Sequence, residues 1–186
     1  MPTATRAPTS APSTGGTWKW LDSTDGVSNI AANLLSTDTI EARADKTNPT
    51  QLETSDFLLA GFDLSLIPAS ARIASVSANI TSRDVSTVTN DLEYNTVQWR
   101  AAGTLVGTNN GGGAFLPDAS TEYKFNLGTL TSAQLKASGS TGLAIRVVCI
   151  AAAKADAKAR LDKVELVVVF TAGGIRTRVR SFGRAR

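Results

Sequence analysis

The sequence predicts an all-β protein, an antiparallel β-sandwich of jelly-roll type with one short helix and extended N- and C-terminal arms. Three observations lead to this fold class. Segments with a two-residue apolar period recur along the middle of the chain. One segment alone carries clear helix-capping signals, and neither end has the composition of a core segment. With 186 residues, 42% of them hydrophobic, the chain suits a single domain with a sizeable core.

The chain divides into three predicted segments. Residues 1–16 are rich in Pro, Ser, Thr, Ala and Gly, a composition that cannot bury enough surface to fold by itself. We therefore expect an extended N-terminal arm there. Residues 17–172 supply the β-sandwich domain, and residues 173–186 form an Arg-rich C-terminal tail.

The first half of the sandwich contains one unmistakable strand. Earlier strand candidates are residues 17–21, 39–44 and 56–63, and Pro68 then marks a loop or a sheet edge. Residues 73–81 alternate strictly between apolar and polar side chains, which predicts a strand with one buried and one wet face.

A break in the alternation marks the next strand, residues 92–101. In a regular strand, Leu92 and Tyr94 would face one side of the sheet, whereas Val97 and Trp99 would face the other. A β-bulge near Asn95 or Thr96 would account for the shift.

The second half of the sandwich contains the expected helix. Residues 103–115 include a run of glycines and predict a flexible connection, and residues 122–127 predict a strand. In residues 131–136, Thr131 and Gln134 stand at capping-box spacing, which predicts a short helix. The last two strands are expected at residues 143–151 and 161–170.

The final strand presents apolar side chains on both faces. Val164, Leu166 and Val168 can face the core, so Val167 and Val169 point the other way. Two valines on the outward-facing side of the same strand indicate that this side is buried as well. This face is either an oligomer interface or a surface covered by the protein's own arm.

The composition argues against an enzyme. The sequence contains no histidine, which removes the usual general base and the commonest metal ligand. The single cysteine, Cys149, lies in an apolar segment and is expected to be a buried core residue. We expect no catalytic residues, no metal and no cofactor. The apolar run 164–170 is interrupted by Glu165 and is too short to cross a membrane, so no membrane association is expected.

Positive charge gathers at the two ends of the chain. Without the terminal arginines the remaining charges sum to a small acidic excess, so the ends are expected to dock on other molecules. An acidic protein surface is the preferred partner, a nucleic acid is disfavoured, and a role in solubility alone is the alternative. The docking residues expected on this basis are Arg6, Arg176, Arg178, Arg180, Phe182, Arg184 and Arg186.

Aromatic side chains offer a competing interpretation. Trp18, Trp20 and Trp99 could form a platform on which sugar rings stack. Such residues more often belong to a core, and their burial would count against the platform.

One segment supports a resemblance to a known family. Residues 62–73, FDLSLIPASARI, lead into the alternating strand and resemble a segment of tailed-bacteriophage structural proteins, in which an Ile-Pro-x-x-Ala-x-Ile turn opens a core strand. The later segments 123–128 and 142–147 continue the same layout, so the resemblance covers roughly residues 56–170. It implies a virion component with a jelly-roll sandwich.

The resemblance implies a capsid decoration or cement protein, made in the host cytoplasm and located on the capsid surface of the virion. We expect a homo-oligomer, with a trimer favoured, that binds the major capsid protein or other virion proteins and stabilises the head shell. The alternatives are a tail- or fibre-associated structural protein and a carbohydrate-binding host-attachment module.

Overall fold

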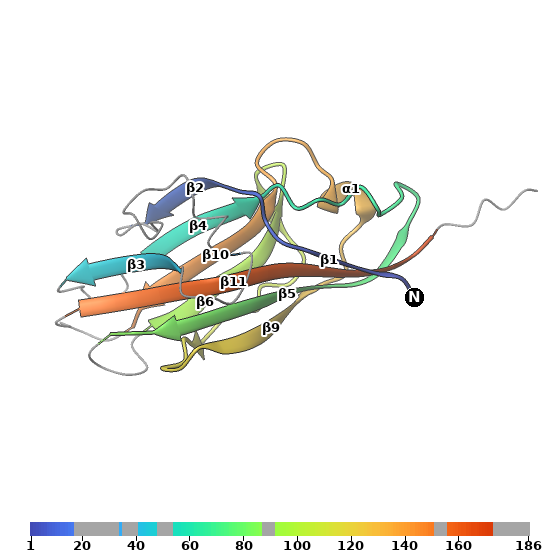
Figure 1. The fold of residues 1–186 in the computed structure, drawn as a ribbon. Helices are drawn as coiled ribbons and strands as arrows, with labels where there is room; N and C mark the ends of the chain where they lie inside the picture. The colour runs from blue at the N-terminus through green and yellow to red at the C-terminus, as the bar shows by residue number, and fades with distance from the viewer. Residues whose placement is uncertain (17–33, 35–40, 48–53, 87–91, 151–155, 173–186) are drawn as a thin grey trace, which may run out of the picture.

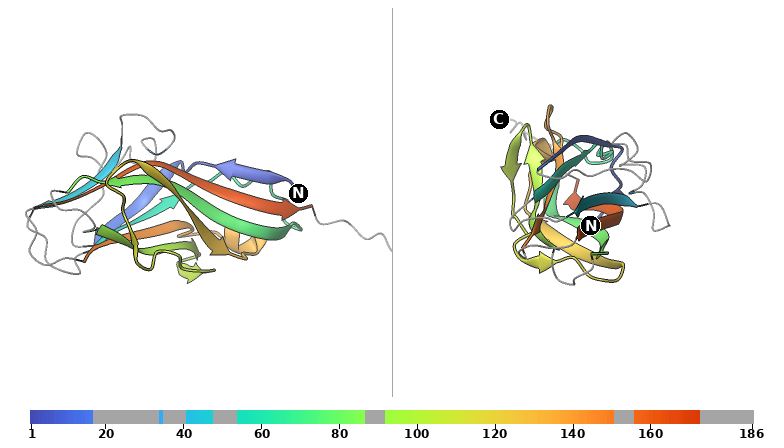
Figure 2. Two further views of the ribbon diagram at one scale, coloured as in Figure 1. Left: turned by 90° about the horizontal axis from the view of Figure 1, so that it is seen from below. Right: turned by 90° about the vertical axis from the view of Figure 1, so that its left-hand side faces the viewer.

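The protein is a sandwich of two antiparallel sheets, seen in a computed structural model (Figure 1). The structure describes residues 1–16, 34, 41–47, 54–86, 92–150 and 156–172. The two sheets face each other along the length of an elongated molecule (Figure 2). The predicted all-β class is therefore confirmed.

Each sheet is built from strands that are distant in sequence. In the first sheet the strands lie in the order β1 (Thr3–Arg6), β11 (Asp156–Thr171), β5 (Arg72–Asp84) and β9 (Thr121–Gly128), and β3 (Ala42–Thr47) also pairs with β11. In the second sheet the order is β2 (Ser10–Gly16), β4 (Thr54–Ala60), β10 (Gly142–Cys149), β6 (Leu92–Ala101) and β7 (Thr104–Val106), and β8 (Ala114–Phe115) also pairs with β6.

The strand order is that of a jelly roll. From β3 to β6 the chain alternates between the two sheets, and it alternates again from β9 to β11. The resulting orders, β3-β11-β5-β9 and β4-β10-β6-β7, each hold four strands, which is the eight-strand, double-sheet arrangement of jelly rolls. The predicted topology is confirmed as well.

The predicted bulge in β6 is present and lies at Asn95. Arg146 of β10 pairs with Thr96 whereas the next residue, Val147, pairs with Tyr94, so Asn95 is the extra residue. The shift lets Tyr94 and Trp99 both enter the core although they have opposite parity. Cys149, at the end of β10, is buried as predicted.

Aromatic rings pack between the two sheets and against the segment that follows β4. Tyr94 of β6 meets Phe125 of β9 edge to face, with 5.0 Å between ring centroids, and Trp99 lies 5.8 Å from Phe62. Offset and edge contacts of this kind are the favoured aromatic geometries. The first contact connects the two sheets, and the second packs the inner side of β6 against the segment that follows β4.

The segment with the Ile-Pro motif carries the chain from the second sheet to the first. It follows β4 and turns twice, with the amide of Ile67 donating to Leu64 O at 3.1 Å and the amide of Ala71 donating to Pro68 O at 2.9 Å. Ile67 is buried, and β5 begins immediately after Ala71. The motif is therefore a structural crossover between the sheets.

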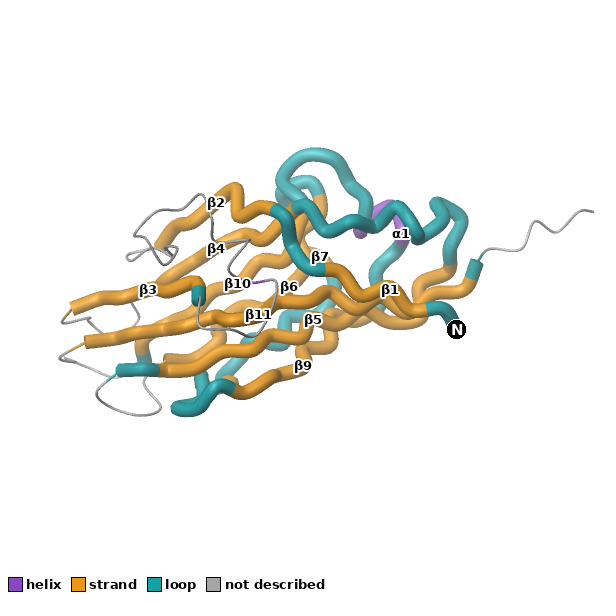
Figure 3. The backbone as a smooth tube through the Cα atoms, viewed as in Figure 1, coloured by secondary structure: helices purple, strands orange, loops and turns teal. Residues whose placement is uncertain are grey.

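The single α-helix of the described residues, α1 (Ser132–Leu135), packs against this crossover. Its capping box is formed as predicted, because the Thr131 hydroxyl accepts from the Gln134 amide and the Gln134 side chain accepts from the Thr131 amide. The Ser132 hydroxyl donates to Pro68 O at 3.1 Å, which ties the helix to the crossover. Figure 3 shows the helix beside this loop at one end of the sandwich.

The first sixteen residues differ from the expected arm. They are extended, as predicted, but Thr3–Arg6 is β1 of the first sheet and Ser10–Gly16 is β2 of the second. Between the two strands, Thr9 donates its amide to Ala60 O at 3.0 Å. This polar segment cannot fold by itself, so its backbone amides and carbonyls find their hydrogen-bond partners in other strands of the domain.

The glycine-rich connection predicted at residues 103–115 is tied to the bulge. Asn109 Oδ1 accepts from the amides of Val97 and Gly111, each at 3.0 Å, and Asn109 Nδ2 donates to Asn95 O at 3.1 Å. A Cβ atom on Gly111 would lie 2.5 Å from the Thr96 amide nitrogen, so only glycine fits this approach. The segment seals the edge of β6 between the short strands β7 and β8.

We predict that Asn109→Ala lowers the free energy of unfolding by about 1–2 kcal/mol, because it removes the acceptor of two backbone amides beside the bulge. Asn95→Ala is the matched control. Its exposed amide makes one long contact with Thr96 Oγ1, at 3.3 Å, so a change within about 0.5 kcal/mol is expected. Urea denaturation followed by fluorescence measures both, and equal losses would contradict this role of Asn109.

Candidate functional site

Among the described residues, two surfaces are candidates for binding another molecule, one on each sheet. The first is the outer face of the first sheet around Val167 and Val169, which we call the valine face. Both valines alternate with buried residues of β11 and are themselves half-buried. The register of the sheet defines the remaining members of the face, which are Thr3, Thr5, Ser75 and Ser77.

The valine face is uncharged. Val167 lies between Thr5 of β1 and Ser77 of β5, and Val169 lies between Thr3 and Ser75. The adjoining rows of the same sheet face carry charge, and Lys163 and Glu165 form an ion pair there at 3.0 Å. The outer face is thus divided into an uncharged part and a charged part.

The structure bears on both interpretations of the outward valines. The N-terminal segment reaches β11, but it pairs with the edge of the strand and lies beside the valines. Thr3 and Thr5 are exposed and extend the face sideways. Residues 3–6 therefore do not cover the outward-facing valines. The role of Val167 and Val169 in an oligomer interface stays a prediction.

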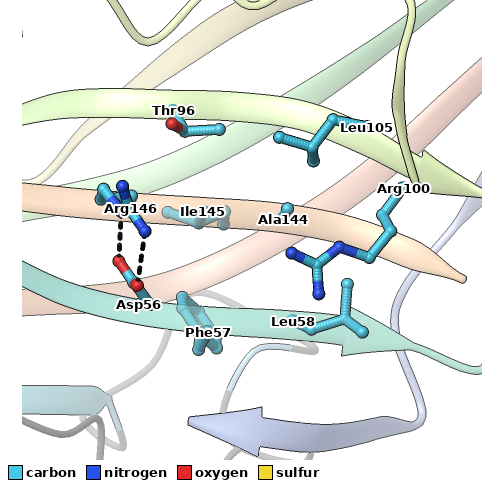
Figure 4. A pocket seen from close by; sticks show the side chains of 9 residues that line it. All are labelled: Asp56, Phe57, Leu58, Thr96, Arg100, Leu105, Ala144, Ile145 and Arg146. Carbon is cyan, nitrogen blue, oxygen red and sulfur yellow. Dashed lines mark hydrogen bonds and ion pairs between the residues drawn. The ribbon is translucent and has the colours of Figure 1, made fainter. Parts of the chain in front are cut away.

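The second surface is a cleft on the outer face of the second sheet, which we call the arginine cleft (Figure 4). It has a volume of about 180 Å³. Its floor is apolar, since Leu58 and Ala144 are only 3% and 8% exposed although they point away from the core. The other residues that form its outer walls are Asp56, Thr96, Arg100, Leu105 and Arg146.

The two arginines of the cleft have contrasting environments. Arg146 binds Asp56 through two hydrogen bonds, Nε to Oδ1 at 2.6 Å and Nη2 to Oδ2 at 2.9 Å, and these bonds raise the pKa of Arg146. Arg100 reaches from the end of β6 toward Ala144 and Leu58 (Figure 4). Its Nε is buried without a hydrogen-bond partner, and no carboxylate of the described residues pairs with it.

A further hollow of about 420 Å³ lies beside α1, lined by Phe62, Leu64 and Trp99. The Lys136 ammonium at its rim donates to the carbonyl of Ile67. Trp99 itself is 1% exposed and its Nε1 donates to Gln134 O at 3.1 Å. These contacts hold the helix on the sandwich.

Arg6, expected to dock on a partner, binds the protein's own crossover. Its Nε donates to Asp63 O at 2.7 Å and its Nη1 to Thr5 O at 2.8 Å. Hydrogen bonds from Ser65 hold the pKa of the Asp63 carboxyl below its usual value, and the charge of Arg6 contributes less. The structure thus gives Arg6 a role in fixing β1 to the sandwich.

The aromatic platform is corrected at one position. Trp99 is a core residue, because its ring faces inward between the sheets and packs against Phe62. Trp18 and Trp20 lie outside the described residues. So do the predicted docking residues of the tail, Arg176, Arg178, Arg180, Phe182, Arg184 and Arg186.

The described residues hold neither a membrane-spanning helix nor a cluster of side chains suited to a metal ion. No helix among them is long and apolar enough to cross a membrane. They contain no group of three or more His, Cys, Asp or Glu side chains arranged to hold a metal ion.

Sequence reasoning missed the arginine cleft. Arg100 directly follows the core residue Trp99, so its outward direction could have been read from the alternation. The ion pair between Arg146 and Asp56 could not have been predicted from the sequence pattern, because 90 residues separate the two side chains. Only the order of strands β4, β10 and β6 brings both arginines to one surface.

No protein-family model matches the sequence, and no curated protein matches it. Among solved structures, the chain is similar to CBM86, a low-affinity xylan-binding module from Roseburia intestinalis, with a TM-score of 0.40 and 11% identity over 93% of this chain and 98% of that chain. A likeness this distant indicates nothing about what this chain binds.

We predict that Arg100→Met raises the free energy of unfolding by about 1 kcal/mol, because it replaces a partly desolvated, unpaired guanidinium over an apolar floor. Arg146→Met is the control and is expected to be neutral or destabilising, since it leaves Asp56 without its partner. Thermal or urea denaturation compares the two. Stabilisation by both substitutions, or a loss of stability with Arg100→Met, would contradict the contrast between the two arginines.

Proposed function

We propose that this protein is a non-catalytic structural component of a bacteriophage virion, and that the sandwich binds other proteins of the particle. Capsid decoration or cementing is the favoured role. The observation that carries the proposal is the valine face, an uncharged strip on a sheet whose adjoining rows are charged. Depletion of charged residues is the compositional mark of the buried centre of protein interfaces.

A second copy of this chain is the proposed occupant of the valine face. A surface without charge can meet a copy of itself without repulsion between like charges, whereas the rows holding Lys163 and Glu165 need a complementary partner. The hydroxyl groups of Thr3, Thr5 and Ser75 can exchange hydrogen bonds across such a contact. We favour a trimer, as expected from the sequence.

The phage setting is supported by the resemblance in residues 62–73. In the structure this segment is the crossover between the sheets, with Ile67 buried and Pro68 O held by α1. Its residues therefore have a structural role in the jelly-roll fold, which such proteins would share.

Attachment to the particle is proposed to be multivalent. The preferred partner is the major capsid protein, and the Arg-rich tail, residues 173–186, is the proposed attachment segment. Several identical weak contacts on one oligomer raise the effective concentration of each, so that the whole binds tightly. The protein would stabilise the shell against internal pressure without turnover of any substrate.

The second candidate is a tail-associated or carbohydrate-binding attachment module. The observation that favours it is the arginine cleft, a concave site with polar walls on an outer sheet face. Against it, the large apolar side chains exposed on the described surface are Met1, Leu66, Leu105 and Phe115, so an aromatic platform for sugar rings is missing there.

Self-association is tested by sedimentation velocity on the full chain. We predict an oligomer for the wild type, and a dissociation constant that is raised at least tenfold when Val167→Lys is combined with Val169→Lys. Two buried ammonium groups would face their own copies, which disfavours the contact. Glu165→Lys on the same strand adds the same side chain outside the face and is expected to preserve the oligomer. A wild-type protein that stays monomeric at about 100 μM would contradict the interface.

Particle binding is tested with phage heads that lack this protein. We predict that the full chain co-sediments with such heads and that replacing the five tail arginines by glutamine weakens binding at least tenfold at low salt. At high salt, the difference in head binding between the full chain and the glutamine variant should become smaller. If neither protein binds heads, the decoration proposal fails, and tail or glycan attachment becomes the leading function.

A further inference from the structure

The arginine cleft contains a cation whose partner is missing from the described part of the chain. The Nε of Arg100 is buried and makes no hydrogen bond. Asp56 lies in the same cleft, but both of its carboxylate oxygens are bound to Arg146. Arg100 therefore has no carboxylate of the described residues within reach that is not already paired.

A guanidinium in this position favours an anion from outside. Five N–H donors in a planar fork match the two oxygens of a carboxylate, and such charge-assisted bonds are among the strongest hydrogen bonds in proteins. Burial against the apolar floor of Leu58 and Ala144 reduces the competition from water. The Arg146–Asp56 pair forms the opposite wall and leaves Arg100 as the cation available for binding.

We propose that the arginine cleft binds an acidic side chain, a glutamate in an extended segment of a partner protein. The carboxylate accepts hydrogen bonds from Arg100, and the methylene groups of the glutamate lie on Leu58, Ala144 and Leu105. This inference rests on the proposed function only in taking the partner to be a protein. It does not depend on the valine face or on the tail.

The lining of the cleft favours a side chain over a sugar. Its apolar contacts come from aliphatic residues, with Leu105 exposed by 43% at the rim. Phe57 also borders the cleft, but it is 3% exposed and belongs to the core. The volume, about 180 Å³, is below the roughly 300–1,000 Å³ typical of sites for whole small-molecule ligands. It suits one side chain inserted from an extended chain.

The Arg100 Nε–H group supplies a direct readout, because its NMR signal moves when a carboxylate binds it. The full ¹⁵N-labelled protein is titrated with the capped peptide acetyl-Leu-Glu-Leu-amide and with its Leu-Gln-Leu counterpart. We expect the glutamate peptide to shift the Arg100 signal at millimolar concentration, the glutamine peptide to bind at least tenfold more weakly, and the Arg146 signal to stay in place.

Variants assign the effect to the side chain. Arg100→Gln is expected to weaken peptide binding at least tenfold, which is judged from the methyl signals of Leu58 and Leu105. Arg72→Gln removes an exposed arginine from the first sheet and should leave binding unchanged. Equal binding of the glutamate and glutamine peptides, or full binding by Arg100→Gln, would overturn the proposal.

A third titration separates the proposed ligand from an acidic sugar. Sodium glucuronate carries the same carboxylate on a sugar ring, and we expect it to bind more weakly than the glutamate peptide. Tighter binding of glucuronate would overturn the assignment to a protein partner. The result is also independent of head binding. Peptide binding without head binding would leave this inference standing while the decoration proposal fails, and the reverse pattern would reject the cleft alone.

Discussion

The alternation of side chains along β11 is the constraint on which the rest of the structure depends. This strand pairs with β5 on one edge and with both β1 and β3 on the other, so it forms the centre of the first sheet. Leu166 and Val168 must face the second sheet to close the core. Val167 and Val169 are thereby placed outside, and the uncharged face is a direct consequence of that register.

In each sheet, two short strands pair with the same edge of one long strand. In the first sheet β3 and β1 share one edge of β11, and in the second sheet β8 and β7 share one edge of β6. The gap between β8 and β7 coincides with the bulge at Asn95, where Asn109 supplies the missing backbone contacts. An exposed edge that would otherwise offer unpaired amides to other chains is protected in this way.

The two outer faces differ in chemistry. The first sheet offers hydroxyl groups and valines without charge around Val167, which suits a contact between identical subunits. The second offers a cation, Arg100, above an aliphatic floor, which suits an acidic group on a different molecule. A protein with both surfaces could join copies of itself through one sheet and a second component through the other, as the proposed structural role requires.

The sequence by itself determined the all-β class, the strand at residues 73–81, the bulge beside Asn95, the capped helix at Thr131 and the burial of Cys149. These features depend on alternation and on hydrogen bonds between near neighbours, so a local pattern reveals them. Only the tertiary structure decided that Trp99 is a core residue and that residues 3–16 complete both sheets. Likewise, only the pairing of strands far apart in sequence gave Arg146 a carboxylate and left Arg100 without one, because a periodic pattern records which way a side chain points but not what lies across from it.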